Sequence, residues 1–248
     1  MIIDCHTHWG SVWEARDGGD AQAWLAVLDS HRVDKAILFG DRSLVRSDLC
    51  QKENDIIARL ADKHPERLVA MGTSWPQMKE RGVTEARRCF ESLNMKGIKF
   101  HPWLQGFSTA DPYLDEICEL AGELGKPIFF HDGTPCYSLS EQIAGLARRH
   151  RRTRFVLAHT GLVWNWRAAM SAMRLPNVWG CLCGPHLRAI ELICAHCDPS
   201  RIIWGSDFGF GLSDAIEYRL NLFLAASVKS ELRERVLDAN PLRLLRGA

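Results

Sequence analysis

The chain has 248 residues, of which 46% are hydrophobic and 25% are charged, a composition typical of a globular protein with a sizeable core. Its 31 basic and 30 acidic side chains give a net charge of +1, which argues against nucleic acid or an acidic membrane surface as a partner. Nine cysteines without paired spacing, and no recognisable secretory signal or long apolar run, lead us to expect reduced thiols, a cytoplasmic location and no membrane span.

Short apolar segments rich in Val, Ile and Phe recur along the chain, and helical patterns separate them. Strands that alternate with helices form parallel βαβ units, and the length is close to the roughly 250 residues of a (β/α)8 barrel. We therefore expect one α/β domain over residues 1–248 with the TIM-barrel fold. The eight predicted strands are residues 2–8, 33–40, 68–74, 97–101, 127–131, 154–159, 178–183 and 201–207.

The predicted helices carry start and stop signals. Aspartate, serine and proline are favourable at the first positions of a helix, and an Asn-Pro pair favours a break. The last helix is expected to end at Asn240-Pro241, after which Leu242, Leu244 and Leu245 dock on the barrel. Helix starts are predicted at or near Asp20, Ser47, Asp111, Ser140, Pro185, Ser213 and Ser230.

The ends of the predicted strands carry the residues with chemical potential. Barrel enzymes place catalytic residues at the C-terminal strand ends, and side chains two apart on a strand share a face. Strand 1 ends in His6 and His8, which therefore point the same way. Five of the ten histidines fall at this rim, together with one aspartate: His6, His8, His101, His131, His159 and Asp207.

Neutral imidazoles and a carboxylate that converge at an open rim match a catalytic Zn²⁺ or another divalent first-row metal, with one position left for water. We predict His6, His8 and His131 as nitrogen ligands and Asp207 as the oxygen ligand. Asp207 would also accept the proton of the metal-activated water. His159 is either a further ligand or a proton donor and acceptor, and we favour the second role.

At this point the chain resembles the amidohydrolase superfamily, and specifically its amidohydrolase-related branch of metal-dependent hydrolases and decarboxylases. The resemblance rests on Asp4-Cys5-His6-Thr7-His8, residues 97–102, the histidines at 131 and 159, Gly205-Ser206-Asp207 and Asn240. It implies a metal held by His6, His8, His131 and Asp207, with His159 assisting catalysis. In two-metal members a strand-4 lysine is carboxylated and bridges the ions, which would give Lys99 that role.

Lys99 and several rim residues are candidates for substrate binding. We expect one metal ion, with a second only if Lys99 is carboxylated; a substrate-binding ammonium or a structural lysine are the alternatives. His101 is a predicted pocket wall, and Trp9, Trp103 and Phe208 are predicted substrate contacts. Tryptophans follow several predicted strands and favour a flat, partly apolar substrate, although loop packing is the alternative: Trp9, Trp13, Trp75, Trp103, Trp164 and Trp166.

Two reactions fit these residues. The leading prediction is hydrolysis, in which a metal-activated water attacks an ester, lactone or amide of a small, aromatic or carboxylated substrate. The alternative is non-oxidative decarboxylation of a small unsaturated or aromatic carboxylic acid. An alternative of another class is a binding module that retains the metal. A nuclease is disfavoured, because the chain has no acidic residue at the end of the third strand and no excess of positive charge to bind a phosphate backbone. Association into a homo-oligomer is also compatible with the sequence.

Overall fold

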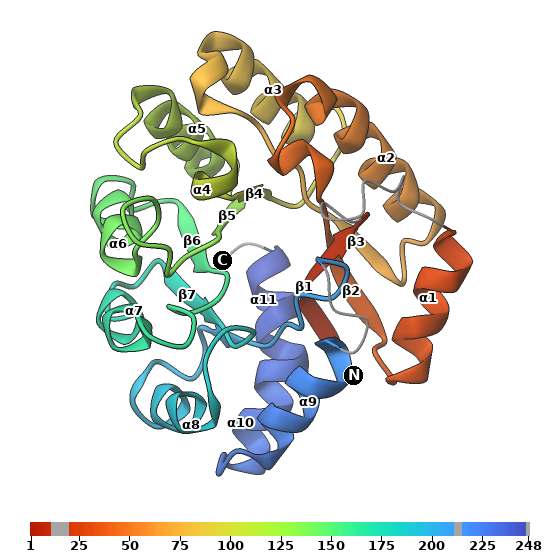
Figure 1. Ribbon diagram of the computed structural model, residues 1–248, viewed down its shortest axis with the longest axis vertical. Helices are drawn as coiled ribbons and strands as arrows, with labels where there is room; N and C mark the ends of the chain where they lie inside the picture. Colours follow the sequence, from red (N-terminus) through yellow and green to blue (C-terminus); the bar gives the residue numbers. More distant parts are fainter. Residues whose placement is uncertain (11–19, 211–214, 247–248) are drawn as a thin grey trace.

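The computed structural model describes residues 1–10, 20–210 and 215–246 and shows a ring of strands surrounded by helices (Figure 1). Every predicted strand is present, in most cases shorter than predicted. The strands are β1 (Ile3–Trp9), β2 (Lys35–Gly40), β3 (Leu68–Ala70), β4 (Ile98–Phe100), β5 (Pro127–Phe130), β6 (Arg154–Leu157), β7 (Val178–Cys181) and β8 (Ile202–Ile203).

The parallel strands follow chain order around the ring. Regular pairing gives one sheet of β1-β2-β3 and one of β4 to β8. Two isolated bridges join these sheets, Gly72 with Ile98 and Thr7 with Phe208. The second bridge is reinforced by hydrogen bonds from the His8 amide to the Phe208 carbonyl at 2.7 Å and from the Asp207 amide to the His6 carbonyl at 2.8 Å. The ring is therefore closed, and the predicted (β/α)8 barrel is confirmed.

The helices form the outer layer. The main ones are α1 (Ala21–Ser30), α2 (Cys50–Lys63), α3 (Glu80–Glu91), α4 (Pro102–Gln105), α5 (Pro112–Glu123), α6 (Ser140–Arg149), α7 (Trp166–Ala172), α8 (Leu187–His196), α9 (Ala215–Ala225), α10 (Ser230–Glu234) and α11 (Asn240–Arg246). The Asp20 and Asp111 carboxylates accept hydrogen bonds from the helix starts, as predicted. Over the described ranges, no helix is long and apolar enough to cross a membrane.

Two helices differ from their predicted bounds. The chain does not break at Asn240-Pro241: a π-helical turn (Arg235–Ala239) links α10 directly to α11. Pro241 lies in the first turn of α11, where a missing N–H costs nothing, so the helix continues through it. The helix predicted near Pro185 begins at Leu187, with His186 as its N-cap. The predicted start at Ser213 lies outside the described residues.

Apolar side chains fill both sides of the barrel wall. A large cluster lies between strands and helices, and a smaller one fills the barrel interior. Leu244 of α11 belongs to the interior cluster, and Leu242 and Leu245 pack against it, which confirms the predicted docking of the last segment. With the interior filled by Ile37, Phe129 and their neighbours, reactants can reach only the strand ends above them.

Candidate metal centre

A β-bulge in β1 sets the direction of the histidines. Asp4 pairs with Ala36 and Thr7 with Leu38, so two residues of β1 lie opposite one residue of β2. His6 and His8 both face the strand-end site, and their Nε2 atoms are 3.0 Å apart. The Asp4 carboxylate holds this arrangement, because its Oδ1 accepts hydrogen bonds from the His6 and Ser206 amides at 3.0 Å each.

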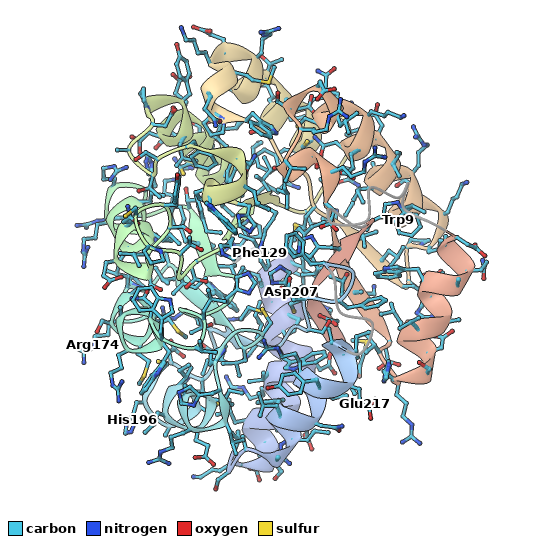
Figure 2. The ribbon with its side chains drawn as sticks, in the orientation of Figure 1. Trp9, Phe129, Arg174, His196, Asp207 and Glu217 are labelled. Atoms are coloured by element: carbon cyan, nitrogen blue, oxygen red, sulfur yellow. The ribbon has the colours of Figure 1, made fainter. Side chains whose placement is uncertain are left out.

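Asp207 approaches these histidines from the segment after β8. Its Oδ1 lies 3.1 Å from His6 Nε2 and 3.4 Å from His8 Nε2. The backbone of Asp207 has a φ of +66°, a region that non-glycine residues seldom adopt and that is often found at functional sites. Two residues later, position 209 must be glycine, because a Cβ there would lie 2.0 Å from the His8 carbonyl oxygen. Figure 2 shows Asp207 near the middle of the strand ring.

The chemistry of this trio fits a divalent metal. In the described part of the chain, the ligand atoms of His6, His8 and Asp207 lie within 4.8 Å of one another. The His6 side chain is buried whereas that of Asp207 is 31% exposed, so the group opens toward the rim. Two nitrogens and one carboxylate oxygen with an open side are the ligand set of a catalytic first-row metal. The structure therefore brings three of the four predicted ligands together.

His131 and His159 form a second, adjoining group. His131 Nδ1 lies 2.8 Å from His159 Nε2, and His131 Nε2 lies 2.8 Å from the Thr134 hydroxyl. Within the described ranges, His131 is not in the compact group of His6, His8 and Asp207, so its ligand role stays a prediction. His159 instead lies within 4.8 Å of His6 and Cys183, counted between ligand atoms.

Most of these histidines are held neutral. Burial and the nearby Lys99 lower the pKa of His131 to about 3, and burial lowers the pKa of His6 and His159 well below 6.5. Burial alone would raise the pKa of Asp207, but the neighbouring His6 and His8 hold it well below its usual value. Free nitrogen lone pairs beside an ionised carboxylate are the forms that bind a cation.

His8 differs because a second carboxylate lies behind it. Asp41, which follows β2 and is completely buried, places Oδ1 2.8 Å from His8 Nδ1. Burial would lower the pKa of His8, but Asp41 and Asp207 together raise it to about 9. A carboxylate on the far nitrogen of a metal-binding histidine orients the ring and increases its basicity. Asp41 was not among the predicted site residues, although an aspartate directly after a barrel strand was an available signal.

The loop that carries Asp41 is fixed by Glu53 of α2. The Glu53 carboxylate accepts hydrogen bonds from the Arg42 amide at 3.2 Å and from the Ser43 amide at 2.6 Å. Gly40 permits this approach, since a Cβ there would lie 2.4 Å from Glu53 Oε2. Helix α2 thus anchors the turn that presents Asp41 to His8.

A second buried aspartate, Asp132, joins the loops after β5 and β6. It accepts hydrogen bonds from the His159 amide at 2.8 Å, from the Gly161 amide at 2.6 Å and from the Ser140 hydroxyl at 2.9 Å. Burial raises its pKa to about 6 despite these donors. Asp132 therefore holds the backbone of His159 and the start of α6, another positioning role that the sequence did not reveal.

Lys99 reaches the metal-binding atoms from β4. Its side chain is almost fully buried, and Nζ lies 3.1 Å from His6 Nε2 and 5.4 Å from the centre of the Phe39 ring. Burial lowers the pKa of Lys99, and Asp207 opposes that shift. An amine in this position can contact a substrate or react with CO₂, so both predicted roles of Lys99 remain predictions.

The predicted substrate contacts divide into two groups. His101 is buried and stacks on His131 with ring centres 3.8 Å apart, and the half-exposed Trp103 lies 6.0 Å from it, so both line the rim. Trp9 and Phe208 instead pack against Trp24 of α1, with ring centres 6.3 and 5.5 Å away.

Strand alternation explains the difference. Each of Trp9 and Phe208 directly follows a residue that faces the site, and so points to the opposite side of the barrel wall. Figure 2 shows Trp9 toward α1, away from Asp207. Trp9 and Phe208 therefore pack on the outer side of the barrel wall, and we do not propose them as substrate contacts. Of the other rim tryptophans, Trp164 is exposed and Trp166 is buried, whereas Trp13 lies outside the described residues.

Comparison of the sequence with known proteins identifies the family of this chain. A sequence model described as amidohydrolase matches residues 3–247. A curated relative, 2-amino-3-carboxymuconate-6-semialdehyde decarboxylase of Dictyostelium discoideum, is 34% identical over 84 residues, which are 34% of this chain and 23% of that protein.

Solved structures share the fold at low sequence identity. A 5-carboxyvanillate decarboxylase from Novosphingobium aromaticivorans, complexed with manganese and 4-hydroxy-3-methoxy-5-nitrobenzoic acid, has a TM-score of 0.76 at 16% identity and covers 99% of this chain and 96% of its own. A 4-oxalomesaconate hydratase from Rhodopseudomonas palustris has a TM-score of 0.73 at 16% identity, with the same coverage. From the match over residues 3–247, the chain belongs to the amidohydrolase family.

Proposed function

We propose that this protein is a metal-dependent decarboxylase that acts non-oxidatively on a small unsaturated or aromatic carboxylic acid. The observation that carries the proposal is the 34% identity over 84 residues with a decarboxylase. The decarboxylase with bound manganese and an aromatic acid supports it through its shared fold. The comparisons therefore favour the alternative reaction over hydrolysis, which was the leading prediction from sequence.

The proposed metal ligands are His6, His8 and Asp207, completed by His131. Zn²⁺ and Mn²⁺ both suit a set of imidazoles and one carboxylate, and we propose one ion. When bound, such an ion holds substrate oxygen atoms and stabilises the negative charge that develops on them. The buried Asp41 keeps the His8 ring aligned from behind, which fixes the site before substrate arrives.

The chain itself must manage one proton. In decarboxylation the bond between the carboxyl carbon and the substrate breaks, CO₂ leaves, and the electron pair remains on the substrate carbon. That carbon then takes up a proton. We assign proton delivery to His159, because it lies at the site and its ring is held in place by His131, 2.8 Å from its Nε2. His159 Nε2 takes up a proton from solvent and passes it to the substrate carbon. Lys99, His101 and Trp103 are the proposed substrate contacts; small-molecule binding, a cytoplasmic location and homo-oligomer formation stay predictions.

Product analysis tests this assignment. The manganese-loaded and zinc-loaded protein is incubated with hydroxylated benzoates and dienoic acids, and separately with esters, lactones and amides. We expect CO₂ in equal amount to the acid consumed, and one deuterium in the product when the solvent is D₂O. A cleaved acid from the second set, without CO₂ from the first, would contradict decarboxylation and restore hydrolysis.

A matched pair of histidine variants tests the role of His159. His159→Asn should keep the bound metal but lose a factor of roughly 10² to 10⁴ in turnover, the usual contribution of a proton-transfer residue. His196→Asn, an exposed position on α8 (Figure 2), should leave turnover unchanged. Equal turnover in both variants would remove His159 from the reaction.

A further inference from the structure

Cys183, two residues beyond β7, contacts two of the site histidines, His6 and His159. Its side chain is almost fully buried, and Sγ lies 3.1 Å from His159 Nδ1 and 3.4 Å from His6 Nδ1. Sγ also lies 2.8 Å from the Ala158 carbonyl oxygen, which in turn is 3.2 Å from His6 Nδ1. The thiol therefore contacts Nδ1 of both imidazoles, whereas their Nε2 atoms lie near His8 and His131.

The number of hydrogens in this cluster determines the direction of its hydrogen bonds. A thiol has one hydrogen, and the Ala158 carbonyl can only accept, so Cys183 donates to Ala158. The sulfur must then accept from the nitrogen of His159 that faces it. A neutral imidazole carries its one hydrogen on either Nδ1 or Nε2, so this contact puts the hydrogen of His159 on Nδ1 and leaves Nε2 as an acceptor.

The same direction continues to the next histidine. His159 Nε2, as an acceptor, takes the hydrogen of His131 Nδ1 at 2.8 Å. In a neutral His131 this leaves Nε2 without a hydrogen, and the Thr134 hydroxyl donates to it at 2.8 Å. All four hydrogen bonds are thus satisfied in one consistent order, from Thr134 through His131, His159 and Cys183 to the Ala158 carbonyl.

We propose that Cys183 is a positioning residue that fixes the tautomers of His159 and, through it, of His131. The proposal rests on the proposed function only for the roles of these histidines. Its consequence is that His131 Nε2 carries a lone pair and no hydrogen, the form a metal ligand needs, and the rotatable Thr134 hydroxyl that donates to it would turn away when a metal binds. Without an acceptor at position 183, a buried His159 Nδ1–H would lose its partner, which favours the opposite tautomer. His159 would then donate to His131 Nδ1, and Nε2 of His131 would carry the hydrogen.

Nitrogen NMR of the histidine rings in the zinc-loaded full chain tests the proposal directly, because the shifts of Nδ1 and Nε2 report which one is protonated. In wild type we expect the hydrogen of His159 on Nδ1. Cys183→Ala should move it wholly or partly to Nε2, whereas Cys183→Ser, which keeps an acceptor, should retain the wild-type tautomer. The His6 tautomer should be unchanged in both variants, since the Ala158 carbonyl still accepts from its Nδ1.

Zinc affinity, measured by competition with a chromophoric chelator, gives the second readout. Cys183→Ala should bind zinc roughly 10 times more weakly or worse, the usual cost of losing an outer partner of a metal site. Cys118→Ala, which removes an equally buried thiol from α5, is the control and should keep wild-type affinity. Unchanged His159 nitrogen shifts in Cys183→Ala would overturn the proposal. Neither measurement depends on turnover, so the absence of decarboxylase activity would leave this test intact.

Discussion

Metal binding should release a proton at neutral pH, because one proposed ligand is protonated in the metal-free protein. His8 has its pKa raised to about 9 by Asp41 and Asp207, whereas the pKa of His131 is lowered to about 3. His6 and Asp207 are likewise shifted toward their proton-free forms. Only His8 among these four must lose a proton when the metal binds.

The magnitude follows from the position of that pKa. At pH 7, about two pH units below the pKa of His8, the metal must displace a proton from this side chain. This competition weakens metal affinity by about 10²-fold, or roughly 2.7 kcal/mol. The logarithm of the apparent affinity should rise by about one per pH unit between pH 6 and 8. In the metal-free protein the same raised pKa stabilises the fold fully below pH 6.5, and this contribution is lost as the pH rises through about 9.

Two aspartate variants make the test specific. Asp41→Asn removes the buried charge next to His8, so its pKa falls and the slope of affinity against pH should become nearly flat above pH 7. Asp48→Asn makes the same chemical change at an exposed position of the same loop and should keep the wild-type slope. Chelator competition gives the slope, and calorimetry in buffers of different ionisation enthalpy counts the protons released. A flat wild-type profile, or an unchanged slope in Asp41→Asn, would show that Asp41 does not raise the pKa of His8.

Three further substitutions test other parts of the structure. Asp132→Ala should lower the free energy of unfolding by about 3 kcal/mol in urea titrations, because three buried donors lose their acceptor; a loss under 1 kcal/mol would show that water replaces the carboxylate. Lys99→Ala should lower metal per chain only if Lys99 bridges two ions, so unchanged metal analysis excludes the bridge. Trp9→Ala should cost about 3 to 5 kcal/mol of stability, whereas Trp103→Ala should raise KM at unchanged stability; the reverse pattern would contradict their placement.

Much of the fold could be predicted because the barrel repeats one simple pattern. Each strand is a short apolar run, and each strand end faces the same rim, so histidines scattered over 150 residues of sequence could be assigned to one site. The predicted ends of the last six strands were set too far along the chain. Residues 158 and 159, for example, follow β6, because their backbone turns to bring His159 toward Cys183 and Asp132.

Features that depend on local backbone geometry could not be predicted. Alternation predicts that His6 and His8 share a face, but the bulge in β1, which sets that face relative to the preceding residues of the strand, has no distinct sequence signal. Alternation beyond the bulge turns Trp9 away, and a tryptophan directly after a metal-binding histidine reads equally well as substrate contact or core. Cys183 was missed for a related reason, because its partners are nitrogens on the far side of the site histidines. Asp41 has the sequence signal of an aspartate directly after a strand, but its contact with the far nitrogen of His8 is visible only in three dimensions.

The reaction itself was the least accessible to sequence. Hydrolysis and decarboxylation use the same metal ligands and the same kind of proton carrier, so the strand ends do not distinguish them. Loop residues that bind the substrate make that difference, and loops carry weaker sequence signals than strands.

The position of a bound metal is the sharpest test of the proposed ligands His6, His8 and Asp207. Crystals of the manganese-loaded protein, measured at the manganese absorption edge, would show the ion by its anomalous scattering. We predict a peak within about 2.3 Å of His6 Nε2, His8 Nε2 and Asp207 Oδ1. A fully loaded protein whose ion lies elsewhere, or contacts none of these three atoms, would contradict this prediction.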